Sequence, residues 1–391
     1  MYRIVIASDS FKGSLSSMEV AEAAARGINA VLPECQTTCL EIADGGEGTS
    51  KVLTRHFDGQ IITTSASDPI GRRIRAEYGI ATIDGIQTAI IEMAQASGLP
   101  LLSQHERNPL LTSTYGTGEM ILDAARKGCR RFLIGIGGSA TNDGGKGMLE
   151  ALGFTFTDKD GARMQGLCGR STKDIYGIDS STIPQDILDS EFIIACDVDT
   201  PFCGPEGASA VFGPQKGATP EMVSELEEGM QNLNAVISRK YGTDLSSVPG
   251  SGAAGGLGGA FLACLGAELK RGIDMVLDSI GFDSIIRDAS LVVTGEGKLD
   301  GQTQQGKVIS GIAARSNALG VPVIAIAGIV DMSDEEIRRS GLAAAFPIGP
   351  RPQTESDLKN AMRPEVASVN ITETVAKALE SLSPSLFRES L

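Results

Sequence analysis

The 391-residue sequence contains no tryptophan, and only 4% of its residues are aromatic. Glycine is abundant instead, at 48 of 391 residues or about 12%, against a typical value near 7%. Such a composition occurs in disordered chains, in collagen and in compact proteins with many tight loops. No three-residue glycine period is present, which excludes collagen, and Ile, Val, Leu and Ala recur in blocks, which excludes disorder. A compact protein with many tight loops remains.

Basic residues are also few. The 34 Lys and Arg against 49 Asp and Glu give a net charge of −15. The sequence has no basic run interleaved with aromatics, so we expect no nucleic-acid partner. A small anionic substrate is compatible with this charge if its pocket concentrates positive groups or backbone donors locally.

Zinc ligands, disulfide patterns and hydrophobic spans are missing as well. The seven cysteines form no Cys-x-x-Cys pair, and only His56 and His105 accompany them, which argues against a zinc site and a disulfide framework. The first residues are typical of a strand, not of a signal peptide. The longest uncharged stretch, residues 245–267, is interrupted by Pro249 and seven glycines. These features predict a cytoplasmic protein with no membrane partner.

Strand and helix patterns alternate at both ends of the chain. Near the N-terminus, residues 3–7 and 36–42 favour strands, and Ser16 with Glu19 forms a capping box for a helix between them. The C-terminal third returns to the same alternation. Its expected strands are 291–294, 321–327 and 343–348, and its expected helices are 308–319 and 371–382. This pattern favours a parallel sheet covered by helices.

The middle of the chain has a different pattern. Short strands are expected at 61–64, 73–83 and 88–93, and turn residues that are typical of hairpins separate them. An insertion is the simplest architecture. The sequence therefore predicts an α/β fold in which residues 1–60 and 285–391 form a Rossmann-like parallel-sheet domain and residues 61–284 form an inserted mixed α/β domain.

The glycines are concentrated. Six segments hold 24 of the 48: residues 9–15, 42–48, 135–147, 203–218, 250–259 and 295–307. Several follow an expected strand directly, and ligands of open α/β sheets bind beyond those strand ends. Glycine there lets backbone N–H groups approach an anion closely. For any one segment, a simple tight turn is the alternative explanation.

Two familiar nucleotide-binding motifs are matched only in part. Gly135-x-Gly137-x-x-Ala140 fits a dinucleotide fingerprint, but no clear acidic residue ends a second strand about twenty positions later. The stretch from Gly301 to Lys307 matches the start of a Walker A loop, but Val308 stands where Ser or Thr would bind magnesium.

The charged neighbours of the glycines are more informative. A lysine and hydroxyls follow the first strand at 9–14, and acids stand at 44–47 and 197–199. Small polar side chains occupy 138–145, and a lysine lies between two acids at 296–300. Acids that hold Mg²⁺, lysines that balance phosphate charge and glycine loops that surround phosphates are the parts that phosphoryl transfer needs.

The matching motifs cover the chain in order: 9–13, 43–49, 136–145, 196–198, 252–256 and 294–300, with Gln302-Thr303 and Gly306-Lys307. In them the sequence closely resembles the type I glycerate kinase family. The resemblance implies ATP-dependent phosphorylation of D-glycerate, on O2, to give 2-phosphoglycerate. It also implies two α/β domains with the active site in the cleft between them, and ATP and Mg²⁺ as the groups bound. It leaves a homo-oligomer open.

Roles follow from the chemistry of the reaction. A carboxylate must accept the proton of the attacking hydroxyl, and we nominate Asp197 first and Asp300 second. Lys12 and Lys298 would compensate charge in the transition state. Asp44 or Asp199 would hold Mg²⁺. Further contacts to the substrate are expected from Ser10, Asn142, Asp143 and either Arg73 or the backbone of Gly137 and Gly138.

The residues expected to bind the nucleotide phosphates lie in the glycine-rich segments. They are Gly13, Ser14, Gly137, Gly138, Ser139, Gly295, Glu296, Gly297 and Lys307.

Three alternatives stay open at this point. One is phosphorylation at O3, or of another small hydroxy acid. Another is an NAD-dependent hydroxy-acid oxidoreductase, against which the missing acidic residue after Gly137 argues. The third is a non-catalytic sugar-acid-binding protein, which would not need so many acids beside lysines.

Overall fold

The two ends of the chain build one parallel sheet, and the middle of the chain builds a second, mixed sheet. The computed structural model describes residues 2–300, 307–382 and 387. By its internal contacts the chain divides into unit 1, Met1–Asp44 with Val276–Leu391, and unit 2, Gly45–Met275. The domain boundaries near 60 and 285 stay a prediction.

The sheet of unit 1 has the order β13-β12-β11-β1-β2, with every neighbouring pair parallel. Its strands are β1 (Arg3–Ser8), β2 (Gln36–Glu41), β11 (Leu291–Asp300), β12 (Val323–Asp331) and β13 (Ala344–Pro347). The first halves of the central strands β11 and β12, and most of β1, are buried because helices cover the sheet.

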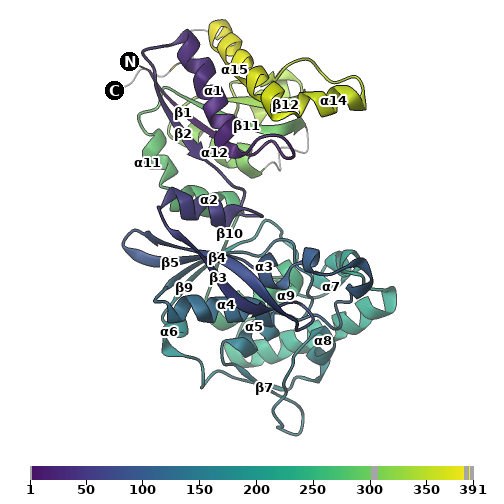
Figure 1. The fold of residues 1–391 in the computed structure, drawn as a ribbon. Coiled ribbons are helices and arrows are strands. Elements are labelled where there is room, and N and C mark those ends of the chain that lie inside the picture. The colour runs from purple at the N-terminus through teal and green to yellow at the C-terminus, as the bar shows by residue number, and fades with distance from the viewer. Residues whose placement is uncertain (1, 301–306, 383–386, 388–391) are drawn as a thin grey trace. The chain divides into compact units, whose positions relative to one another are not determined.

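Helices α1 (Ser17–Val31) and α15 (Pro364–Ser381) pack side by side on one face of this sheet (Figure 1). The Ser16 hydroxyl accepts from Glu19 N–H, and the Glu19 carboxylate accepts from Ser16 N–H, so the expected capping box is present. The remaining helices of the unit are α11 (Phe282–Ile286), α12 (Lys307–Ala318), α13 (Asp334–Arg339) and α14 (Glu355–Ala361).

The sheet of unit 2 has the order β10-β9-β6-β5-β4-β3. An antiparallel meander, β3 (Gln60–Ser67), β4 (Arg73–Ile83) and β5 (Ile86–Glu92), forms one side. Strands β6 (Arg131–Gly135), β9 (Glu191–Ala195) and β10 (Glu268–Lys270) continue from β5 in parallel. A separate antiparallel pair is made by β7 (Thr155–Thr157) and β8 (Gly177–Asp179).

Helices surround this second sheet (Figure 1). They are α2 (Thr49–His56), α3 (Ala94–Ser97), α4 (Tyr115–Arg126), α5 (Lys146–Ala151), α6 (Gln185–Leu188), α7 (Ala208–Phe212), α8 (Pro220–Tyr241) and α9 (Ala253–Leu265). The 3₁₀ turns are η1 (Leu99–Leu101), η2 (Gln104–Glu106), η3 (Gly169–Asp174), η4 (Pro214–Lys216) and η5 (Leu245–Ser247). Helix α10 (Gly272–Ser279) carries the chain from unit 2 into unit 1.

The α/β class expected from the sequence is confirmed, with a parallel sheet and a mixed sheet as predicted. Strands β11 and β12 extend beyond the predicted segments, and β10 and the β7–β8 pair were not predicted. Within the described ranges, no helix combines the length and the apolar character needed to cross a membrane.

Candidate active site

In unit 1 the chain changes direction between two neighbouring strands. From β1 it crosses to β2 on one side, whereas from β11 it crosses to β12 and β13 on the other. Ligands of open α/β sheets bind beyond the strand ends at such a switch point. Here the Asp9 N–H donates to the Gly295 carbonyl at 2.9 Å and joins the two strand ends. A Cβ on Gly295 would lie 2.6 Å from the Ile326 carbonyl oxygen, so only glycine permits this approach.

A cavity of about 410 Å³ opens at this edge of the sheet. Its polar lining comes from the strand ends: Asp9, Ser10, Lys12, Ser14, Glu296 and Lys298. Its apolar lining comes mainly from Ile329 of β12 and from the chain after that strand: Ile348, Pro350, Pro352, Leu358 and Met362. The cavity can therefore take a ligand that has an apolar part and an anionic part.

Asp9, at the end of β1, lies near the carboxylate of Asp44, which follows β2. Burial raises the pKa of Asp9 above its ordinary value of 3.8, the Ser10 N–H opposes this, and the nearby Asp44 carboxylate adds to the rise. A cation would relieve that repulsion. No cluster of three or more Asp, Glu, His or Cys side chains suited to a metal occurs in the part of the chain that the structure describes. Mg²⁺ commonly uses one or two carboxylates and the phosphates of its nucleotide, so Asp9 and Asp44 fit a magnesium ion that arrives with a nucleotide.

The loop after β1 closes on itself. Phe11 and Leu15 exchange backbone hydrogen bonds at 2.8 and 3.1 Å, which leaves Lys12 and Gly13 exposed at the tip. The Ser14 hydroxyl oxygen is buried beside the cavity and has no hydrogen-bond partner among the described residues. A buried polar atom in this state is costly unless a ligand satisfies it.

Lys298 and Asp300 lie where β11 and β12 extend beyond the other strands. The Lys298 ammonium lies 2.6 Å from the Asp300 carboxylate, and this hydrogen bond raises the pKa of Lys298. Gly297, which stands between Glu296 and Lys298 in the sequence, also lines the cavity. Lys307 begins α12, and its side chain lies outside the described residues.

In unit 2 the loops after the parallel strands also meet at one edge. Gly45 lies against Ala195, Gly272 and Gly135, and a Cβ on Gly45 would lie 2.3 Å from Gly272 Cα. Asp197 follows β9 and accepts a 2.8 Å hydrogen bond from Gly272 N–H, which fixes one of its carboxylate oxygens. Asp199, two residues further on, is exposed.

The glycine loop, residues 137–145, follows β6. Gly137 and Gly138 are exposed, whereas the residues after Ser139 are buried. Asp143 accepts four hydrogen bonds, from Thr114 N–H and hydroxyl and from the N–H groups of Gly145 and Gly147, so it holds the loop in shape. The Asn142 side-chain amide donates to Ser209 Oγ at 3.2 Å, while its oxygen is buried with no partner among the described residues.

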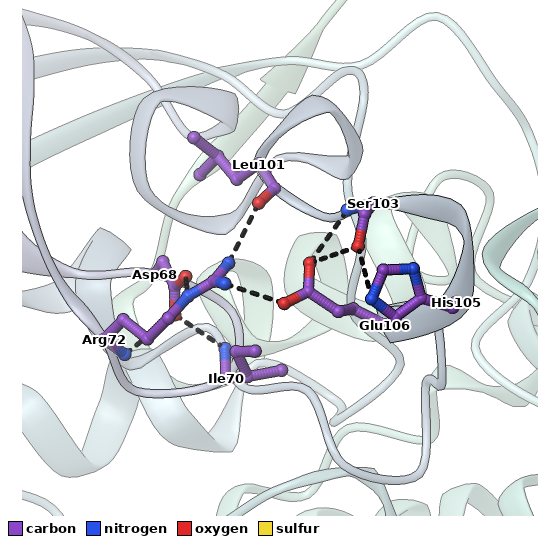
Figure 2. Close-up of polar contacts among 7 residues, drawn as sticks. All are labelled: Asp68, Ile70, Arg72, Leu101, Ser103, His105 and Glu106. Carbon is purple, nitrogen blue, oxygen red and sulfur yellow. Dashed lines mark hydrogen bonds and ion pairs between the residues drawn. The ribbon is translucent and has the colours of Figure 1, made fainter.

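A second segment braces the glycine loop from the side. Leu99 N–H donates to the Gly138 carbonyl, and Ala140 N–H donates to the Ser97 carbonyl. Figure 2 shows how Arg72 anchors this segment, with its guanidinium directed at Asp68, Glu106 and the Leu101 carbonyl; the Arg72–Glu106 contact is 2.7 Å.

A further segment beside the glycine loop, near the start of α9, carries backbone strain. Ala254, Gly255 and Gly256 are all left-handed, with φ of 53°, 69° and 91°, and a Cβ on Gly255 would lie 2.1 Å from the Thr141 carbonyl oxygen. A left-handed alanine is unfavourable, and such positions cluster at functional sites.

Two buried lysines lie under this edge, and the sequence analysis did not single them out. The Lys146 ammonium donates to the Cys168 carbonyl and Thr172 Oγ1, while the Lys216 ammonium donates to Ser139 Oγ and the Thr141 carbonyl. Burial lowers the pKa of each from 10.5 to about 7, against the opposing charge of Asp143. The signal available in the sequence was a lysine inside a glycine-rich, otherwise uncharged segment, at 213–217. Asp9 was also missed, although it begins the first motif.

The predicted site residues thus fall into two groups. At the switch point of unit 1 the structure gathers Ser10, Lys12, Gly13, Ser14, Asp44, Gly295, Glu296, Gly297, Lys298 and Asp300. At the parallel-strand edge of unit 2 it gathers Gly137, Gly138, Ser139, Asn142, Asp143, Asp197 and Asp199. Arg73 belongs to neither group, because its guanidinium is bound to Ser65 and Ser67 on β3 and to Glu119 on α4.

Comparison with known proteins gives a consistent result. The family model described as "Glycerate kinase family" matches residues 4–382. A Bacillus subtilis (strain 168) protein named glycerate kinase is 45% identical over 89% of this chain and 90% of its own length. An Escherichia coli (strain K12) protein named glycerate 2-kinase is 42% identical over 88% and 90%.

A solved structure agrees with these relatives. The crystal structure described as glycerate kinase 2 from Salmonella typhimurium LT2 has a TM-score of 0.85 and 40% identity, and the match covers 97% of this chain and 98% of that one. The chain belongs to the glycerate kinase family. The resemblance, the fold class and the enzyme class expected from the sequence are confirmed, and the oxidoreductase and the non-catalytic binding protein are set aside.

The buried Lys146 predicts a pH-dependent stability. Its pKa is about 7 in the folded chain and near 10.5 when exposed, so between these values the unfolded state holds more protons and stability rises with pH. Replacing it with methionine removes that contribution. The free energy of unfolding of wild type, relative to that of Lys146→Met, should rise by about 1 kcal/mol per pH unit above about pH 7. Urea unfolding followed by far-UV circular dichroism measures this difference.

The exposed Lys359, on α14, provides the control. Its replacement by methionine should change the free energy of unfolding by the same small amount at each pH. A difference between wild type and Lys146→Met that does not change with pH would contradict the buried-ammonium interpretation.

Proposed function

We propose that this protein transfers the γ-phosphoryl group of ATP to O2 of D-glycerate, giving 2-phospho-D-glycerate and ADP. The observation that carries the proposal is the pair of polar groups at the ends of parallel strands, one in each unit. Unit 1 offers a cavity with an apolar and a polar side, and unit 2 offers a glycine loop with carboxylates beside it. Family membership supports the reaction class.

We place the nucleotide in unit 1. Its cavity, about 410 Å³, falls in the range of about 300–1,000 Å³ that suits a ligand larger than a three-carbon acid. The apolar side, with Pro350, Leu358 and Met362, suits a purine base. The polar side offers Lys12, Lys298, Ser10, the unpartnered Ser14 hydroxyl and the backbone of Gly13 and 295–297 for phosphate oxygens.

Asp44 and Asp9 are the residues that would hold magnesium, with Asp199 as a second candidate. Bound there, Mg²⁺ would neutralise part of the charge on the phosphate oxygens. The lysines would share that task, because Lys12 and Lys298 stand exposed beside the same cavity.

We place the acid in unit 2. The exposed backbone of Gly137 and Gly138 and the Ser139 hydroxyl can donate to its carboxylate oxygens, and the Asn142 side-chain oxygen, which has no partner among the described residues, can accept from a hydroxyl. Asp143 acts through the loop, since its carboxylate already accepts four hydrogen bonds from the chain.

Asp197 is our candidate base. A carboxylate within hydrogen-bond reach takes the O2 proton as the O2–P bond forms and the bond from γ-phosphorus to the β,γ-bridging oxygen breaks, releasing ADP. The Gly272 N–H holds one Asp197 oxygen, which orients the group. Asp300 is the second candidate, although its pairing with Lys298 lowers its availability as a base. Phosphorylation at O3 stays the alternative to this proposal. A homo-oligomer stays open, and a cytoplasmic location stays a prediction.

A coupled assay of ADP release over a panel of small hydroxy acids tests the function. We expect turnover with D-glycerate and ATP, dependence on added Mg²⁺, and a product that phosphorus NMR identifies as the 2-phosphate. Turnover of a different hydroxy acid with none on glycerate would contradict the substrate, and a 3-phosphate product would contradict the position.

Replacing Asp197 by asparagine tests the base. Because general base catalysis contributes about 100- to 10,000-fold, kcat should fall by a factor in this range while the fold is kept. Asp160→Asn, a change at an exposed acid near β7, should leave kcat unchanged. Near-normal turnover by Asp197→Asn would eliminate it as the base.

Replacing Lys298 by methionine tests the nucleotide side. Loss of a charged donor to phosphate should lower kcat/KM for ATP on the order of 10- to 100-fold. Lys359→Met removes another exposed lysine of unit 1 and serves as the matched control. An unchanged kcat/KM for ATP in Lys298→Met would rule out this assignment.

A further inference from the structure

The Lys216 ammonium forms no ion pair with a carboxylate among the described residues. Lys216 is 2% exposed, and its ammonium donates to two neutral oxygens, Ser139 Oγ at 2.8 Å and the Thr141 carbonyl at 2.6 Å. Within the part of the chain that the structure describes, no carboxylate lies within ion-pair distance of it. Asp143 acts on it only at longer range, and that carboxylate is bound to Thr114 and the backbone of the loop.

Burying an ammonium in this way is unfavourable. Isolated buried charges are costly, and proteins normally pair them. The lowered pKa of Lys216 reflects that cost. An anion bound on the outer side of the loop would supply the missing charge, because the ammonium lies directly beneath Ser139.

The second buried lysine differs in its surroundings. Three carboxylates, Asp143, Asp174 and Glu150, act on Lys146, and its hydrogen bonds go to Cys168 and Thr172. It braces the η3 segment and makes no contact with Gly137, Gly138 or Ser139 among the described hydrogen bonds. The two lysines are thus alike in burial and different in what they hold.

Ser139 connects the buried charge to the surface. Its hydroxyl oxygen accepts from Lys216, so its single proton remains for another acceptor, and none is present among the described residues. Ser139 is 8% exposed and directly follows the exposed Gly137 and Gly138. A hydroxyl polarised by an ammonium is a stronger donor than a free one.

We propose that Lys216 is a positioning residue for the carboxylate of the acid substrate: it holds the glycine loop, directs the Ser139 hydroxyl to that carboxylate and supplies its counter-charge from below. The inference rests on the proposed function. A nucleotide phosphate has the same anionic oxygens, but the cavity suited to a nucleotide lies in unit 1, whereas Lys216 and Ser139 belong to unit 2.

Steady-state kinetics of Lys216→Met, Ser139→Ala and the double variant test it, with D-glycerate and its neutral amide as alternative substrates. Because hydrogen bonds to charged groups contribute about 1.5–3 kcal/mol, KM for glycerate should rise about 10- to 100-fold in Lys216→Met. KM for ATP should not change. The preference for glycerate over the amide should fall by the same factor, which loss of stability alone would not cause.

Two comparisons sharpen the result. The double variant should be little worse than Lys216→Met alone, since both changes remove the same interaction. Lys146→Met, the equally buried control, should keep both KM values and the preference for glycerate. Ser139→Ala provides the answer if Lys216→Met does not fold.

The opposing outcomes are distinct. If wild type is active on glycerate, and both Lys216→Met and Ser139→Ala keep the wild-type KM for glycerate and the wild-type preference for glycerate over the amide, this inference alone is overturned. A rise in KM for ATP instead would mean that the loop binds phosphate, which also overturns it. Wild type with no activity on glycerate overturns the proposed function and this inference with it.

Discussion

Strand ends in both units are held by backbone contacts that are too close for any side chain. In unit 1, Gly295 passes between Ser8 and the Ile326 carbonyl, and Asp9 N–H reaches its carbonyl. In unit 2, Gly45 rests on Gly272, and Gly135 rests on Gly45. Every polar group that we assign to the reaction depends on these contacts, because they decide where the loops after the strands begin. At these positions the structure requires glycine.

The net charge of −15 and the handling of anions are compatible because the positive groups are local. Lys12 and Lys298 stand exposed beside the cavity of unit 1, where they can meet phosphate. In unit 2 we propose that the positive charge comes from the buried Lys216, which donates to Ser139 and Thr141, while the surface offers backbone and hydroxyl donors. In our proposal the two units therefore differ, because unit 1 uses exposed lysines and unit 2 uses a buried one.

Local patterns in the sequence predicted most of the strands. The capping box at Ser16 depends only on neighbouring residues, and it is present. Strand β10 could not be predicted, because Glu268–Lys270 has no apolar pattern and forms only by pairing with β9. The first half of α15 has a mixed pattern that becomes helical through its packing on α1.

The sequence predicted which loops lie at the strand ends, but it did not predict the contacts that their side chains make. Charged residues beside glycines marked loops that the structure places after the parallel strands, since parallel strands end at a common edge. Arg73 was expected to bind substrate because it is basic, but its pairing with Glu119 comes from the β3–β4 register and helix α4, which are distant in sequence. Lys216 was missed for the opposite reason, since burial, which gives it its character, cannot be read from a glycine-rich loop.

The central claim is that the nucleotide binds in unit 1 and the acid in unit 2. Hydrogen–deuterium exchange on two binary complexes, one with Mg²⁺ and a non-hydrolysable ATP analogue and one with D-glycerate, tests it most directly. The account predicts that the nucleotide slows exchange at residues 11–15 and 348–362, and that glycerate slows it at 137–141. Protection of 137–141 by the nucleotide, with 11–15 and 348–362 unchanged, would contradict it.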